Sequence, residues 1–152
     1  MKGIKRRQAA RRVAVQALYL LNETDQVTVD QAIEFALESG NFPEEGYGQL
    51  EEPYLHELVQ GVQNHTDDLD SKITPYLINW TLDRIAKIDL IILRLAFYEI
   101  FYQSDEIVPP AVAVNEAIEL TKVFSDDRSR QFVSGVLAQA MDALKDEKNN
   151  DE

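Results

Sequence analysis

The 152-residue sequence contains no cysteine, which excludes disulfides, thiolate metal sites and a cysteine nucleophile. Glycine and proline are also scarce, at six and five residues, whereas 45% of the residues are hydrophobic, as in a globular protein. No apolar run reaches the roughly 18 residues that a membrane-spanning helix needs. The chain start lacks the apolar segment and cleavage site of a signal peptide. The sequence therefore predicts a single globular domain in the cytoplasm, without a membrane partner.

Sequence motifs for catalysis are missing as well. There is no glycine-rich nucleotide loop, no Gly-x-Ser-x-Gly turn and no His-Glu-x-x-His pair. The two histidines, His56 and His65, are nine residues apart in a polar stretch. The many carboxylates fit a solvated helical surface. The sequence thus predicts no catalytic residue, no metal site and no cofactor, and the protein is not expected to be an enzyme.

Positive charge is concentrated at one end of the chain. The other 140 residues hold 9 bases and 27 acids, whereas residues 1–12 hold no acid and six bases: Lys2, Lys5, Arg6, Arg7, Arg11 and Arg12. Because phosphate contacts supply most of the affinity for nucleic acids, this segment is a candidate arm for RNA or DNA. A solvated terminus without a partner would have the same composition, so charge alone leaves both interpretations open.

The basic segment leads into a sequence that favours a helix. Residues 9–23, AARRVAVQALYLLNE, contain neither glycine nor proline and are rich in good helix formers. Small and apolar residues recur at three- and four-residue steps and predict a buried face of Ala10, Ala14, Ala17, Leu18 and Leu21. Arg12 and Tyr19 are two turns apart along one side, so the helix could offer guanidinium groups to phosphates and a ring to a base. Packing of Tyr19 in the core would explain the same spacing.

The remainder of the chain also shows helical periodicity. A Thr-x-x-Gln capping box opens a predicted helix at 28–39, which Gly40 ends, and a loop follows at 41–49. Another helix follows Pro53, and a further one runs from Thr66 towards Leu77 with a break at Pro75. The most apolar segment, 86–102, is expected to be the central helix.

The last two predicted helices span residues 111–124 and about 128–144. The first should bury Val112, Ala113, Ala117, Ile118 and Thr121. No segment shows the period-two alternation of a hairpin. The predicted fold class is therefore all-α, with about seven helices in one domain at 1–145. A weak division is expected near residue 80, and the polar segment 146–152 is predicted to be a disordered tail.

A group of charges lies at the start of the predicted central helix. Asp83, Arg84, Lys87 and Asp89 are close together in sequence there. Ordinary surface charge would explain them, and so would a binding surface.

The turn before the last helix combines basic and aromatic side chains. Arg128 and Arg130 precede Phe132 at a helix start. Helix N-termini attract anions, and a ring flanked by arginines can stack on a base. A capped helix start with a phenylalanine in the core remains the alternative.

Three segments together resemble the NusB family of bacterial antitermination factors. They are RRVAVQALY, DRIAKIDLIILRLAFYEI and VAVNEAIELTKVFSDDRSRQFVSGVL, and the resemblance extends from about Arg6 to Met141. Two positions depart from the family pattern. Ser134 stands where the family usually has Asn in F-V-N-G-V-L, and Arg128 stands where related chains often carry an acid.

The resemblance implies a fold, partners and site residues. Members are all-α with two helical subdomains, and they bind boxA RNA together with NusE, a small-subunit ribosomal protein, in a complex on RNA polymerase. The family's surface for boxA-like single-stranded RNA corresponds here to Arg6, Arg7, Arg11, Tyr19, Arg128, Arg130 and Phe132. The concentrated charge of the first twelve residues adds Lys2 and Lys5 to the expected RNA contacts. The NusE surface would include Asp83 and Asp89, which we expect to be exposed acids facing a basic partner.

Two other functions fit the same residues. A NusB-like domain is fused to some ribosomal RNA methyltransferases, so the chain could be related to such an RNA-binding module. Some family members pair up, so a homodimer is a further expectation, and a helical protein that only self-associates is the third interpretation.

Overall fold

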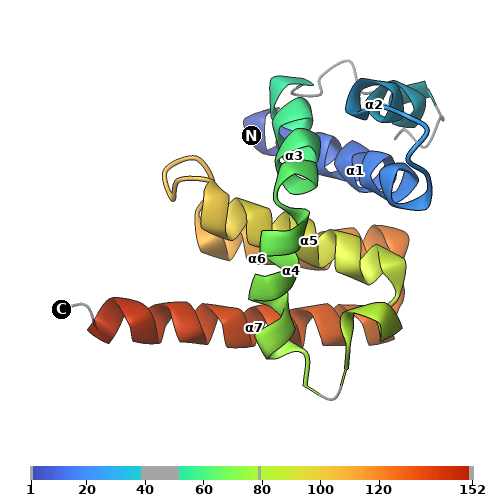
Figure 1. The fold of residues 1–152 in the computed structure, drawn as a ribbon. Coiled ribbons are helices and arrows are strands. Elements are labelled where there is room, and N and C mark those ends of the chain that lie inside the picture. The colour runs from blue at the N-terminus through green and yellow to red at the C-terminus, as the bar shows by residue number, and fades with distance from the viewer. Residues whose placement is uncertain (1, 39–51, 79, 151–152) are drawn as a thin grey trace. The chain divides into compact units, whose positions relative to one another are not determined.

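A computed structural model describes residues 2–38, 52–78 and 80–150, and the side chains of 6–38, 53–78 and 80–147. Within these ranges the chain is helical and contains no β-strand, which confirms the predicted all-α fold class (Figure 1). The helices are α1 (Lys2–Glu23), α2 (Val29–Glu38), α3 (Glu52–Asn64), α4 (Thr66–Ile73), α5 (Lys87–Tyr102), α6 (Pro110–Phe124) and α7 (Asp127–Asn150), with short 3-10 helices η2 (Thr74–Tyr76) and η3 (Leu82–Arg84). The predicted stop at Gly40 and the loop at 41–49 lie outside the described residues.

The chain divides into two compact units between α3 and α4. Unit 1 comprises Met1–His65 and unit 2 comprises Thr66–Glu152. This boundary lies earlier than the division that we expected near residue 80. The reason is that α4 packs against α5 and η2 packs against α7, so both belong with the C-terminal helices.

Unit 1 is built around α1, which contacts both α2 and α3. The alanine-rich face of α1 is buried as predicted, apart from Leu21, which is half-buried. The predicted capping box opens α2. The Thr28 backbone N–H donates to Gln31 Oε1 at 2.9 Å, and the Gln31 N–H donates to Thr28 Oγ1 at 3.1 Å. These reciprocal bonds satisfy donors that a helix start otherwise leaves exposed.

Unit 2 has α5 at its centre, in contact with α4, α6 and α7 (Figure 1). Ten of the sixteen residues of α5 are buried, as expected for its apolar sequence. Pro110 occupies the first turn of α6, as predicted. Val112 is 41% exposed, so its predicted burial is wrong. Ala113 and Ala117 lie on the buried face of α6. Val112 precedes Ala113 by one residue, which rotates its side chain by about 100° away from that face.

The final helix is longer than the sequence predicted. The Ser129 N–H donates to Asp126 Oδ1 at 2.9 Å, so Asp126 caps the start of α7. At its other end α7 continues to Asn150 and therefore includes most of the segment that we expected to be a disordered tail.

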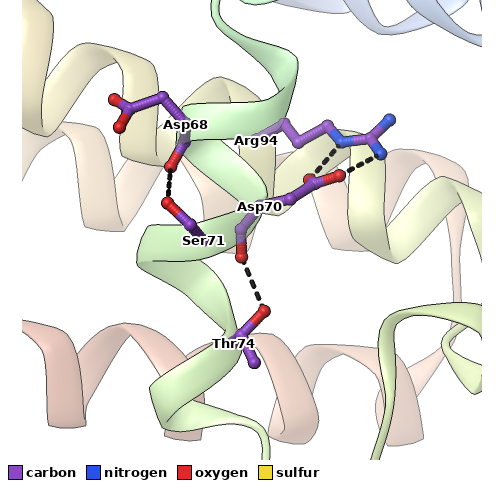
Figure 2. A network of polar contacts seen from close by, with 5 residues as sticks. All are labelled: Asp68, Asp70, Ser71, Thr74 and Arg94. Atoms are coloured by element: carbon purple, nitrogen blue, oxygen red, sulfur yellow. Dashed lines mark hydrogen bonds and ion pairs between the residues drawn. The ribbon is translucent and has the colours of Figure 1, made fainter.

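A two-pronged ion pair joins α4 to α5 (Figure 2). Arg94 Nε donates to Asp70 Oδ1 at 2.8 Å, and an Arg94 terminal nitrogen donates to Asp70 Oδ2 at 2.9 Å. The pair is mostly sheltered, with side-chain exposures of 15% and 19%. The Asp70 backbone carbonyl also accepts from Thr74 Oγ1 at 2.7 Å, where α4 passes into η2. The pair fixes the central helix to its neighbour.

Candidate nucleic-acid interface

The basic start of the chain is part of α1. All six bases of residues 1–12 lie on this helix. The side chains of Lys2 and Lys5 lie outside the described residues. Arg6 is exposed, whereas Arg7 is half-buried. The predicted helical presentation of these arginines is confirmed.

Two of the arginines are held against the ring of Tyr54 in α3. The guanidinium carbon of Arg7 lies 4.8 Å from the ring centroid, and that of Arg11 lies 5.9 Å from it. Tyr54 and Arg11 are both only 3% exposed. Cations over an aromatic face are attracted by its electron density, so Tyr54 restrains both side chains. Arg11 is thus mainly a packed residue, and Arg6 is the most exposed of the three predicted RNA-binding arginines on α1.

Tyr19 lies further along the same helix and is 41% exposed. This exposure contradicts the alternative that the Tyr19 ring is packed in the core. The ring could therefore be reached by a ligand.

The turn between α6 and α7 presents basic side chains in unit 2. Arg128 is exposed, while Arg130 is half-buried and pairs with Asp127 at 3.2 Å. The hydrogen bond from the Ser129 N–H, with help from the charge of Arg128, holds the pKa of Asp126 below its ordinary value. The helix start thus carries an ionised cap beside an exposed guanidinium.

Phe132 is half-buried and contacts Trp80, a residue that sequence reasoning did not assign to the site. The two ring centroids are 6.4 Å apart and the rings meet edge to face at 67°. Both rings line a pocket of about 610 Å³, together with Arg84 and Arg128. The sequence offered one indication of this residue: Trp80 is the only tryptophan in the chain, and it lies shortly before the charged pair Asp83 and Arg84.

The two predicted partner-binding acids differ in their surroundings. Asp83 is exposed and accepts a hydrogen bond from Thr81 Oγ1. Asp89 is only 5% exposed, so the prediction that it is an exposed charge is wrong. Ser129 Oγ donates to its Oδ2 at 2.8 Å and Ser125 Oγ donates to its Oδ1 at 3.3 Å. Burial raises the pKa of Asp89, and the two serine bonds oppose that shift.

Within the described ranges, no group of His, Cys, Asp or Glu side chains is arranged to hold a metal ion. His56 Nδ1 instead lies 3.5 Å from Asp30 Oδ1 in unit 1. None of the described helices is long and apolar enough to cross a membrane.

Known proteins resemble this chain over nearly its whole length. The NusB family model matches residues 8–142. The transcription antitermination protein NusB of Lactiplantibacillus plantarum is 50% identical over 136 residues, which cover 89% of this chain and 94% of that protein. The protein of the same name from Bacillus subtilis is 44% identical over 133 residues, covering 88% and 92%.

The fold is similar to that of solved structures. A chain in the crystal structure of antitermination factors NusB and NusE in complex with dsRNA aligns with a TM-score of 0.72 and 26% identity. The alignment covers 91% of this chain and 98% of that chain. Family model, relatives and fold agree with the sequence motifs quoted above, and the chain belongs to the NusB family.

Proposed function

We propose that this protein is a transcription antitermination factor that binds boxA-like single-stranded RNA together with NusE, as part of an antitermination complex on RNA polymerase. Its relatives at 50% and 44% identity are transcription antitermination proteins. A chain of similar fold was crystallised with NusE and dsRNA. In this chain, the observation that carries the proposal is the basic start of α1, with Arg7 and Arg11 fixed over Tyr54.

The arrangement of α1 suits phosphate binding. The protein as a whole has a net charge of −12, so RNA can approach favourably only where bases are gathered. Arg6 is exposed for pairing, and the restrained Arg7 side chain would lose less conformational freedom on binding than a mobile one. Further along the helix, the exposed Tyr19 ring offers a surface on which a base could stack.

A salt titration of RNA binding tests this proposal. Arg6→Ala should weaken binding of a boxA-like oligonucleotide and reduce the slope of log K against log salt by about 0.7, the value for one lost phosphate contact with a single strand. Lys122→Ala is the matched control, since this lysine is half-exposed on α6 and pairs with Glu119. Affinity of the Arg6 variant equal to that of wild type at every salt concentration would reject the α1 site.

We further propose that Asp83 contributes to NusE binding. It is an exposed acid in η3, shortly before the central helix α5, and complementary charge favours association with a basic partner. Asp83→Lys should reduce NusE affinity in calorimetry, while Asp142→Lys makes the same charge change on an exposed position of α7 and should leave it unchanged. Equal affinities for the two variants would remove Asp83 from the partner surface. The predicted role of Asp89 at this surface stays a prediction.

The alternative functions lead to different measurements. An RNA-binding module related to ribosomal RNA methyltransferases would be supported by methyl transfer from S-adenosylmethionine, which we do not expect of this chain. A protein that only self-associates would sediment as a dimer and would not bind RNA in the salt titration.

A further inference from the structure

We propose that Trp80 is the ring on which an unpaired RNA base stacks, in the pocket formed by the starts of α5 and α7. This inference rests on the proposed RNA binding and assigns a ligand class to the pocket. The sequence predicted Phe132 as the stacking ring, whereas the structure favours Trp80, whose ring contacts Phe132.

The exposure of the two rings sets their roles. Trp80 is 53% exposed, whereas Phe132 is half-buried on α7. The edge-to-face contact between them, at 6.4 Å and 67°, is a favoured geometry for aromatic pairs. Phe132 is therefore placed to hold the indole in position, and the indole offers the larger accessible face. Phe132 acts here as a positioning residue.

The other walls of the pocket select the chemistry of the occupant. The volume of about 610 Å³ lies within the range of small-molecule sites, and Ile85 and Ala86 provide apolar lining. Asp126 also lines the pocket, and its lowered pKa keeps it ionised near neutral pH. The carboxylate of Asp126 favours a neutral ring with amino donors beside it, whereas Arg84 and Arg128, which line the same pocket, favour phosphate. The lining therefore fits a nucleotide whose base and phosphate contact different residues.

Two guanidinium groups could bind the phosphates of the stacked nucleotide. Arg84 and Arg128 are both exposed and both line the pocket. A base stacked on Trp80 would bring its backbone phosphates to these arginines, and arginine is well suited to pairing with phosphate. An aromatic side chain of a protein partner could stack equally well, but it would bring no anionic group to pair with Arg84 and Arg128. The observations therefore favour single-stranded RNA.

Because Trp80 is the only tryptophan, its fluorescence reports on this pocket alone. Adding a single-stranded boxA-like oligonucleotide to the full chain should quench the emission. An abasic nucleotide placed successively along the RNA should abolish the quenching at one position, which identifies the stacked base. Trp80→Ala should weaken RNA binding about ten- to a hundredfold, as expected for one stacked base, while Trp80→Phe should retain most of the affinity.

Controls separate this inference from the proposed function and from misfolding. Phe35→Ala removes another exposed aromatic ring, on α2, and should bind RNA as wild type does. Circular dichroism melting should show that the Trp80 variants remain folded. If RNA binds the wild type without quenching, and Trp80→Ala binds equally well, the stacking role is overturned while the proposed RNA binding stands. Fluorescence that responds to NusE but not to RNA would overturn it in favour of a protein site. A wild-type chain that binds no RNA would overturn both.

Discussion

Asp89 lies buried where the start of α5 meets the turn between α6 and α7, and two serine hydroxyls hold its carboxylate. Burial raises its pKa above the ordinary value of 3.8. The folded protein therefore holds this proton more tightly than the unfolded chain does. The resulting stabilisation is fully present below pH 3.8 and is lost as the pH rises through the raised pKa.

Asp89→Asn should consequently flatten the dependence of unfolding free energy on pH above about pH 4. Asn can still accept from one serine, whereas Asp89→Ala leaves both hydroxyls without this acceptor and should cost about 1–3 kcal/mol. Urea denaturation at several pH values would measure both effects. Parallel pH profiles for wild type and Asp89→Asn would show that Asp89 does not titrate in this range.

Tyr54 is a buried residue whose ring contacts the guanidinium groups of Arg7 and Arg11. Replacing it with Leu keeps an apolar side chain at a buried position but removes the ring beneath Arg7 and Arg11. Such cation–ring contacts contribute about 0.5–1 kcal/mol or more. We expect Tyr54→Leu to weaken RNA binding several-fold by freeing the arginines, and Tyr54→Phe to bind as wild type does.

The comparison of these two variants should be made on folded protein, since loss of a buried aromatic also lowers stability. Denaturation curves give the folded fraction, and fluorescence anisotropy of labelled RNA gives the affinity. Equal RNA affinity of the Leu and Phe variants would mean that the ring has only a packing role.

Between elements, the Arg94–Asp70 pair links α4 to the central helix (Figure 2). Its two parallel bonds require both side chains to be correctly placed, which gives the contact directional specificity. Because the groups are mostly sheltered from water, Asp70→Ala should cost about 1–3 kcal/mol of unfolding free energy, much of it from leaving Arg94 without its acceptor.

A double-mutant cycle with Asp70→Ala and Arg94→Leu would isolate the coupling between the two side chains. Lys122 and Glu119 provide a control cycle on the surface of α6, where an exposed i,i+3 pair should couple by only about 0.2–0.5 kcal/mol. A coupling for Arg94–Asp70 no larger than that of the surface pair would contradict its structural role.

At the level of helices, periodicity was a reliable guide because the amphipathic helices packed around α5 each bury one face. The capping box of α2 and the proline at the start of α6 were both predicted from residue types whose effect is local. Burial of individual positions was harder to predict. Val112 is apolar and lies beside the buried face, but only the packing of α6 on its neighbours decides which side is covered.

For the whole molecule, the sequence indicated the fold class and the basic segment, but it did not indicate which side chains meet across the chain. Asp89 looked like a surface charge because its partners, Ser125 and Ser129, are distant in sequence. Trp80 and Phe132 are likewise separated by more than two helices. Contacts of this kind depend on tertiary packing, and a single sequence contains no local pattern that reports them.

The contact of Arg7 and Arg11 with Tyr54 also has a consequence for biosynthesis. Translation proceeds from the N-terminus, so Arg7 and Arg11 are synthesised before α3 and its Tyr54. Until α3 is made, these cations lack the ring that orders them. The ordered arrangement of these arginines therefore arises only once Tyr54 has been made and unit 1 can fold, so a chain that stops short of α3 would carry the same charges without that arrangement.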